Sequence, residues 1–303
     1  MYRILITGGT GLLGINWALA RRDRDEIMLV MHNRKVNIEN IFLEKIDLFS
    51  FIDIYLAIKK FKPDFVVHAA SLTSVEECED NVSLAEKVNI DLALNVAAAC
   101  NKLKIKLVHI STDHLFSGDK PFVDEKQATN PRNTYGLTKA RAEQQVQRVN
   151  LGSLIVRTNF YGWGPSYRQS FSDIIINSLR NLSEIHLFND VFYTPILIEL
   201  LIEKIENLIS INASGIFNIV GDDRVTKYQF GLALAKEFNL DNNLIKPISI
   251  LTRKELTLRP LDMSLSNRKV SNQINSKLAG IEDHIKKLRM QELRGFSQEI
   301  QKL

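Results

Sequence analysis

The segment NTYGLTKARAE, residues 133–143, places Tyr135 four residues before Lys139 at the expected start of a helix. At this spacing two side chains lie on one helix face and can reach the same ligand. A phenol beside an ammonium group could exchange a proton with a carbonyl oxygen, because the positive charge favours the phenolate and lowers its pKa. Tyr55 and Lys59 in YLAIK have the same spacing, so spacing alone does not identify an active site.

A glycine-rich segment, TGGTGLLG at 7–14, separates the short apolar run YRILIT from LLGINWALARR. This order predicts a strand, a tight turn and a helix. Gly8 would allow the turn, Gly11 would let the backbone approach a pyrophosphate, and Gly14 would permit close packing of the helix. Since free N–H groups at a helix N-terminus bind phosphates, the segment predicts a dinucleotide site.

The end of the second predicted strand indicates which dinucleotide is bound. An acid there usually holds the ribose 2′-hydroxyl of NAD, whereas an arginine accommodates the 2′-phosphate of NADP. This strand ends MHNRK, which contains Arg34 and Lys35 but no acid. We therefore expect NADP(H) to be preferred, with NAD(H) as the alternative; the competing interpretation of these residues is a solvated basic loop.

Polar side chains also follow the strand IKLVHIS, where Ser111, Thr112 and Asp113 occur in HISTDHLFSG. Ligands of open α/β sheets bind beyond the carboxyl ends of the strands. These residues, with Tyr135 shortly after them, are therefore candidates for a site at that edge. Serine, threonine and aspartate are equally common in ordinary loops and caps.

Apolar runs alternate with helical patterns through the first 160 residues, at 2–7, 26–32, 64–70, 105–111 and 153–159. This alternation predicts an α/β protein with a Rossmann-like, doubly wound parallel sheet and a smaller C-terminal α/β substrate lobe. We expect the dinucleotide-binding domain at 1–160, with elements near 190–221 joining it. The substrate lobe would comprise 161–189 and 222–280, and 281–303 would form a helical tail on the surface or facing a partner.

Bulk properties exclude several classes of protein. The 303 residues carry a formal net charge of +4 and 45% hydrophobic residues, which does not favour binding to nucleic acid or membranes. The apolar stretch at 194–209 contains four charges, too many for a membrane span. The two cysteines form no ligand pattern, and we expect a cytoplasmic protein. The six histidines show no HExxH spacing, and we expect no metal site.

Together these motifs resemble the extended short-chain dehydrogenase/reductase family. The matching segments are TGGTGLLG, HAAS at 68–71, STD at 111–113 and YGLTK at 135–139. Within that family the chain looks most like the dTDP-4-dehydrorhamnose reductases, which reduce the 4-keto group of a nucleotide-linked 6-deoxysugar. VRTNFYG, GIFNIVGDDRVTKYQFGLALAKEF and RPLDMSLSNRKV are similar in character and order to that group's sugar-nucleotide lobe.

The resemblance assigns a role to each catalytic candidate. Tyr135 would donate a proton in the reduction, and Lys139 would tune it and hold the nicotinamide ribose. Thr112 would hydrogen-bond the substrate oxygen, and Asp113 would bind the sugar or relay a proton. Phe160 would contact the sugar or base; the alternative for this residue is core packing. Arg259 would bind a diphosphate; its alternative is a surface ion pair. The residues implied to bind the cofactor are Gly8, Thr10, Gly11, Leu12, Leu13, Gly14, Arg34, Asp47, Leu48, Ala69, Ala70, Ser71, Tyr135 and Lys139.

His114 marks a departure from the related enzymes. Sugar-nucleotide 4,6-dehydratases of this family carry a glutamate at that position, and the rhamnose-pathway reductases a tyrosine. The histidine weighs against dehydration and leaves the identity of the nucleotide sugar open. A nucleotide-sugar epimerase and a non-catalytic NADP-binding regulatory subunit remain alternatives, and a homodimer is compatible with each of these readings.

Overall fold

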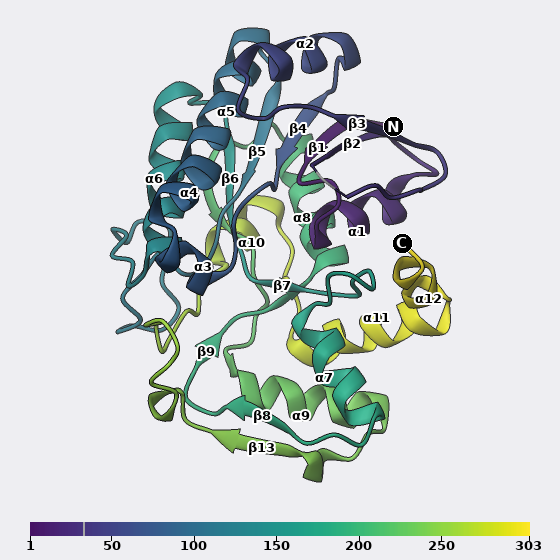
Figure 1. Ribbon diagram of the computed structural model, residues 1–303, viewed down its shortest axis with the longest axis vertical. Coiled ribbons are helices and arrows are strands. Elements are labelled where there is room, and N and C mark those ends of the chain that lie inside the picture. The colour runs from purple at the N-terminus through teal and green to yellow at the C-terminus, as the bar shows by residue number, and fades with distance from the viewer. Residues whose placement is uncertain (33) are drawn as a thin grey trace.

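A computed structural model describes residues 1–32 and 34–303 and has a parallel sheet of seven strands at its centre (Figure 1). The strands lie in the order β11-β6-β5-β4-β1-β2-β3, and each pair within the sheet is parallel. Their bounds are β1 (Arg3–Thr7), β2 (Glu26–Met31), β3 (Ile41–Lys45), β4 (Phe65–His68), β5 (Lys106–Ile110), β6 (Leu154–Arg157) and β11 (Gly215–Asn218). The predicted Rossmann-like, doubly wound class is confirmed.

Helices cover both faces of the sheet, which explains why its strands are nearly continuous in apolar residues. Along β1, Ile4 and Ile6 pack into one core and Leu5 into the other. The helices packed on the Leu5 face are α2 (Phe51–Phe61), α5 (Leu92–Leu103) and α6 (Thr134–Val149). Those on the opposite face are α1 (Leu12–Arg21) and α8 (Ile198–Ser210).

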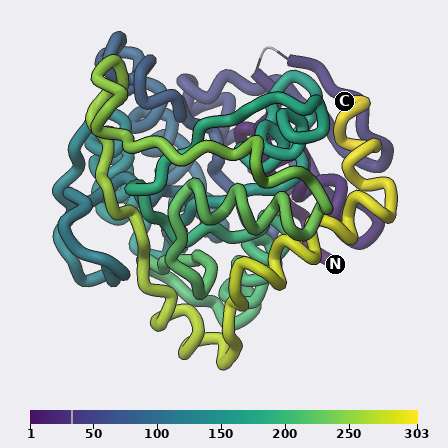
Figure 2. Tube along the Cα trace, turned by 90° about the horizontal axis from the view of Figure 1, so that it is seen from below, coloured from purple at the N-terminus to yellow at the C-terminus, as the bar shows by residue number. Residues whose placement is uncertain are grey.

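Shorter elements after residue 160 form a second layer beyond the carboxyl ends of the strands (Figures 1 and 2). β8 pairs with β13 in parallel, β9 pairs with β12 antiparallel, and β7 pairs with β10 in parallel. These elements are β7 (Phe160–Tyr161), α7 (Phe171–Arg180), β8 (Ile185–Phe188), β9 (Phe192–Tyr193), β10 (Ile196–Leu197), β12 (Val225–Thr226), α9 (Lys227–Phe238) and β13 (Ile245–Ile248). α10 (Arg268–Ile274) packs instead against α8 and β11 of the central sheet. α9 begins after an N-cap at Thr226, which forms a reciprocal capping box with Gln229.

One apolar cluster runs from the sheet into this second layer. It contains Ile6 and Trp17 from the first part of the chain and Phe230 and Leu234 from α9. The residue limits that we expect for the two lobes stay a prediction, because no break in the core marks a boundary between them.

The helical segment 82–103 is divided by a π-helical turn. The elements around it are α3 (Val75–Asp80), α4 (Val82–Glu86), η1 (Lys87–Asp91) and α5. Inside the turn, buried Asn89 donates to the Thr138 hydroxyl at 3.0 Å and accepts the Leu72 N–H at 2.8 Å. The π-helical turn directs the Asn89 amide towards the segment after β4, and the irregular turn therefore allows contacts with distant parts of the chain.

The C-terminal tail folds onto the rest of the chain. α11 (Ile281–Leu293) buries Ile285 and Leu288, and the Leu288 carbonyl accepts a hydrogen bond from the Trp163 indole at 3.1 Å. α12 (Phe296–Gln301) reaches α1, where Glu299 pairs with Arg22 at 2.6 Å. The buried side of the tail is therefore covered by its own chain, while Met290 and Leu293 of α11 are exposed.

No helix in the described ranges is both long and apolar enough to cross a membrane.

A buried ion pair connects α6 to the sheet. Arg157, the last residue of β6, donates to the Glu143 carboxylate of α6 at 2.7 Å, and both side chains are 3% exposed. Ser111, just after β5, also donates to Glu143. Because an unpaired buried charge is strongly unfavourable, the pair ties the position of α6 to the ends of β5 and β6.

Replacing Arg157 with methionine should lower the free energy of unfolding by about 3–5 kcal/mol, since it leaves Glu143 buried without its partner. The exposed pair of Arg141 and Glu86, about half exposed on each side, provides the control. Arg141→Met should cost less than about 1 kcal/mol. Urea denaturation of both variants measures the difference, and equal losses would contradict a structural role for the buried pair.

Candidate active site at the carboxyl edge of the sheet

A cavity of about 1090 Å³ opens where β1, β2, β4, β5 and β6 end. It is lined by all but two of the residues that sequence analysis assigned to cofactor or substrate. Those that line it are Gly8, Thr10, Gly11, Leu12, Leu13, Arg34, Asp47, Leu48, Ala69, Ala70, Ser71, Thr112, Asp113, Tyr135, Lys139 and Phe160. The two outside it are Gly14 and Arg259.

The glycine turn forms one wall of this cavity. Gly8 has a φ of +68°, and a Cβ there would lie 2.7 Å from the Ala70 backbone nitrogen, so both conformation and space require glycine. Gly11 is the N-cap of α1 and provides no side-chain cap to the first N–H groups. The turn therefore leaves a helix N-terminus open to an anion, as a pyrophosphate requires. Gly14 lies buried within α1, packed on the backbone of Gly9.

The ends of β2 and β3 form the far part of the cavity. Arg34 follows β2, and Asp47 and Leu48 follow β3. The Asp47 carboxylate accepts the Phe49 N–H at 2.9 Å, which fixes the turn that presents this segment. Arg34 is exposed, and its guanidinium lies 4.0 Å from the centre of the Tyr167 ring.

The opposite part of the cavity brings Thr112, Tyr135 and Lys139 together. Tyr135 lies in the first turn of α6, which begins after Asn133 as N-cap. Burial raises the pKa of Tyr135 to about 12, while the hydroxyl of Thr112 beside the phenol opposes the rise. Tyr135 is thus protonated at neutral pH, as a proton donor must be.

The expected lowering of the Tyr135 pKa by Lys139 was wrong for this state of the protein. The Lys139 ammonium donates to the Ile110 carbonyl at 2.8 Å, and its charge does not offset the burial of the phenol. Burial also lowers the pKa of Lys139 to about 8, with Glu143 opposing the shift. Lys139 therefore loses its proton about one pH unit above neutrality.

The close approach of α6 to the loop after β5 depends on the residue that follows Tyr135. A Cβ on Gly136 would lie 2.3 Å from the His114 carbonyl oxygen, so a larger side chain would force the helix outwards. The His114 ring packs edge-on against Tyr135, with ring centres 5.4 Å apart. Burial lowers the pKa of His114, which makes the imidazole a neutral neighbour of the phenol.

Asp113 is fixed by a neighbour that sequence analysis missed. The Asn159 amide donates to Asp113 at 2.7 Å, and the Thr112 hydroxyl is 3.3 Å from the other carboxylate oxygen. Asn159 stands in the RTNFYG segment beside Phe160, and both residues line the cavity. Its position after a strand end was a usable signal, but its pairing with Asp113 joins residues 46 apart in the chain.

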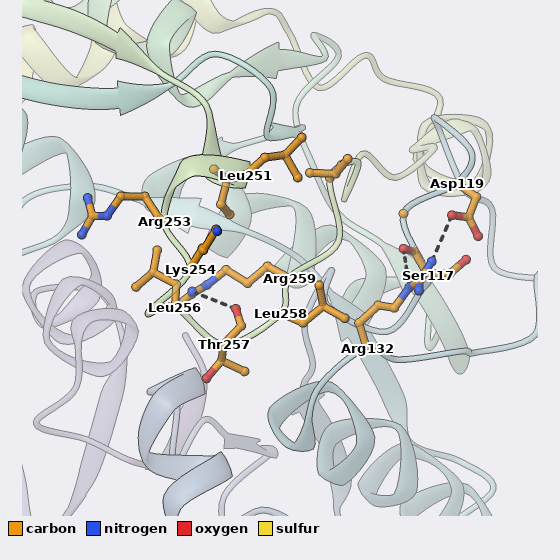
Figure 3. Close-up of a pocket in the computed structure, with 13 residues that line it drawn as sticks. Ser117, Asp119, Arg132, Leu251, Arg253, Lys254, Leu256, Thr257, Leu258 and Arg259 are labelled. Carbon is orange, nitrogen blue, oxygen red and sulfur yellow. Dashed lines mark hydrogen bonds and ion pairs between the residues drawn. The ribbon is translucent and has the colours of Figure 1, made fainter.

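Arg259 does not line the large cavity. It borders a second pocket of about 360 Å³ (Figure 3). Its guanidinium pairs with the Glu76 carboxylate of α3 at 2.5 Å. Its role towards substrate stays a prediction. Tyr55 and Lys59, the pair with the same spacing as Tyr135 and Lys139, lie on α2 outside the large cavity, with the ammonium 5.9 Å from the ring centre.

Histidines behind the site are core residues. His68 and His109 stack with ring centres 5.4 Å apart, and burial lowers both pKa values, that of His68 to about 3. His68 shares a 2.7 Å hydrogen bond with the Thr7 hydroxyl. Within residues 1–32 and 34–303, no group of three histidine, cysteine, aspartate or glutamate side chains has the arrangement of a metal site.

Known structures and sequences share this architecture over most of the chain. A structure described as a hypothetical dTDP-4-dehydrorhamnose reductase from Sulfolobus tokodaii is 28% identical, with a TM-score of 0.80, and covers 91% of this chain and 96% of that one. The dTDP-4-dehydrorhamnose reductase of Bacillus anthracis in complex with NADP is 24% identical, with a TM-score of 0.83 and coverage of 96% and 99%, which shows the fold alone. Methionine adenosyltransferase 2 subunit beta of Bos taurus is 27% identical over 82% of this chain and 75% of its own length.

A doubly wound parallel sheet with an open helix N-terminus after its first strand defines the Rossmann-like class of α/β proteins. The chain belongs to the RmlD substrate binding domain family, whose sequence model matches residues 2–293.

Lys139 should give folding a pH dependence of defined sign. Its pKa falls from 10.5 to about 8 on folding, so between these values the unfolded chain holds a proton that the folded chain has lost. The free energy of unfolding then rises with pH, by about 1.4 kcal/mol per pH unit from this group. Urea denaturation across this window should show that contribution in the wild type and its loss in Lys139→Met; equal slopes would contradict it.

Proposed function

We propose that this protein reduces the 4-keto group of a nucleotide-linked 6-deoxysugar at the expense of NADPH, with Tyr135 as the proton donor. The observation that carries the proposal is the presence of two features in one cavity. An open helix N-terminus with a glycine turn stands at one side, and Thr112, Tyr135 and Lys139 stand at the other. The first suits a pyrophosphate, and the second suits a carbonyl.

The residues of the cavity fit a nicotinamide dinucleotide. Gly8, Gly11 and the first N–H groups of α1 would hold the pyrophosphate, and Asp47 and Leu48 would border the adenine. Ala69, Ala70 and Ser71 would line the middle of the cofactor, and Lys139 would reach the nicotinamide ribose. The bound cofactor supplies the hydride that adds to the carbonyl carbon.

The protein's own side chains carry out the proton transfer. As hydride reaches the carbon, the carbonyl oxygen gains negative charge and takes the proton from the Tyr135 hydroxyl. The Thr112 hydroxyl donates to the same oxygen and stabilises that charge. The Lys139 ammonium would stabilise the phenolate left on Tyr135.

The sugar would lie against the Asp113 side of the cavity. Asp113, fixed by Asn159, would accept hydrogen bonds from sugar hydroxyls, and Phe160 would pack against the sugar or base. A cytoplasmic location and a homodimer stay predictions. Incubation with NADPH and candidate 4-keto-6-deoxy nucleotide sugars, followed by mass spectrometry, identifies the sugar and nucleotide through a product two mass units heavier than its substrate.

Tyr135→Phe should lower kcat by about 10²–10⁴-fold, because it removes the transferred proton and leaves the ring in place. NADPH affinity should stay within about threefold of the wild type. Tyr55→Phe, the same change in a tyrosine of the same spacing to lysine, should leave kcat unaltered. NADPH oxidation with a reducible sugar nucleotide measures all three proteins, and a few-fold effect of Tyr135→Phe would overturn the assignment.

NADPH should be used in preference to NADH, since the end of β2 presents Arg34 and no acid. Steady-state kinetics with the two cofactors at equal sugar concentration give the ratio of kcat/KM, which we expect to exceed about tenfold. A clear preference for NADH would contradict the assignment of Arg34 to the 2′-phosphate.

A non-catalytic, NADP-binding subunit is the second candidate. It is favoured by the 27% identity to a protein named as a subunit of methionine adenosyltransferase. The retention of Thr112, Tyr135 and Lys139 in one cavity favours the enzyme instead. Calorimetry of cofactor binding beside the NADPH-oxidation assay separates the two, because binding without turnover across a panel of 4-keto sugars supports the subunit. An epimerase or dehydratase would leave the amount of NADPH unchanged.

A further inference from the structure

A loop at residues 163–170, which we call the strap, lies between β7 and α7 and contributes to the lining of the large cavity. Both of its ends are held by hydrogen bonds. The buried Asp173 carboxylate accepts the N–H groups of Gly164 and Ser170 at 2.8 and 2.7 Å. The Asn16 amide of α1 donates to the Trp163 carbonyl at 2.8 Å. The strap is therefore anchored at both ends, and its middle is placed by these anchors.

The middle of the strap touches the cavity on two sides. The Tyr167 hydroxyl donates to the Thr10 carbonyl of the glycine turn at 3.0 Å. Arg168 donates to the Thr73 hydroxyl, in the segment after β4, at 3.1 Å. Tyr167, Arg168 and Gln169 all line the cavity. A segment that leads into the C-terminal part of the chain thus borders the place where the pyrophosphate would lie.

Tyr167 also contacts Arg34. The Arg34 guanidinium carbon is 4.0 Å from the centre of the Tyr167 ring. Contact with an aromatic ring can order an exposed guanidinium. Burial raises the pKa of Tyr167, so its hydroxyl keeps the proton that it donates to Thr10.

We propose that Tyr167 is a positioning residue for cofactor selection, which holds the Arg34 guanidinium at the adenosine end of the cavity to meet the 2′-phosphate that distinguishes NADP from NAD. This inference rests on the proposed function and adds a residue of the strap to it. The ring of Tyr167 performs the selection through Arg34, and its hydroxyl joins the strap to the glycine turn that holds the pyrophosphate shared by both cofactors.

These two contacts predict different outcomes for two substitutions. Tyr167→Leu removes the ring and should weaken NADPH binding by about tenfold while NADH binding changes by less than about threefold. Tyr167→Phe keeps the ring and loses the hydroxyl, so the two affinities should fall by the same small factor and their ratio should stay within about twofold of the wild type. Tyr55→Leu, which removes an aromatic ring beside Lys59 and Lys102 outside the cavity, is the matched control.

Isothermal titration calorimetry of the full chain with NADPH and NADH measures both affinities without any need for turnover. Arg34→Ala should lower the preference as Tyr167→Leu does, and the double variant should lower it no further, since the two residues act as one unit. Thermal unfolding of each variant checks that it is folded, and Tyr167→Gln, which also removes the ring, replaces Tyr167→Leu if the latter does not fold.

The inference is overturned if Tyr167→Leu keeps the wild-type ratio of affinities while Arg34→Ala lowers it, because Arg34 then selects the cofactor without its neighbour. In that case the proposed reductase activity stands. A wild-type protein that binds both cofactors equally overturns the inference and the NADP assignment but permits reduction with NADH. A wild type that binds neither cofactor overturns the inference and the proposed function together.

Discussion

The hydrogen bond from the Lys139 ammonium to the Ile110 carbonyl is the contact on which the candidate site depends. It joins the second turn of α6 to the last residue of β5, the strand that also presents Thr112. Burying an ammonium group is unfavourable, as the lowered pKa of Lys139 shows, and the neighbouring structure offsets that cost. Glu143 lies one turn further along α6 and holds the same helix to β6 through Arg157. The phenol of Tyr135 is placed by a helix that is fixed at two successive turns.

His114 determines the charge and the packing beside the Tyr135 phenol. A carboxylate beside Tyr135 could act as a base in water elimination, whereas a neutral imidazole whose ring packs against the phenol cannot supply a negative charge. The His114 carbonyl oxygen lies so close to Gly136 that any residue with a Cβ would clash with it. The residue thus shapes the phenol's surroundings with both its backbone and its ring.

Features encoded by neighbouring residues could be predicted from the sequence. The glycine turn and the polar residues at the ends of β2 and β5 depend on short patterns, and the structure has them where they were expected. Contacts between distant segments could not be read in this way. Tyr167 forms a hydrogen bond with Thr10, 157 positions away. Asn89, in the π-helical turn, forms one with Thr138, 49 positions further on. The direction of the Tyr135 pKa shift also escaped prediction, because it is decided by how deeply the assembled fold buries the phenol.

The apolar cluster shared by the sheet and the second layer limits how ligands can enter. Two bodies with separate cores can swing about a hinge, but here the rings of Trp17 and Phe230 belong to one continuous core. Swinging the layers apart would expose this interior to water, at a free-energy cost comparable to unfolding much of the molecule. Access of a ligand to the cavity is then left to small movements of surface loops rather than to a swing of the two layers.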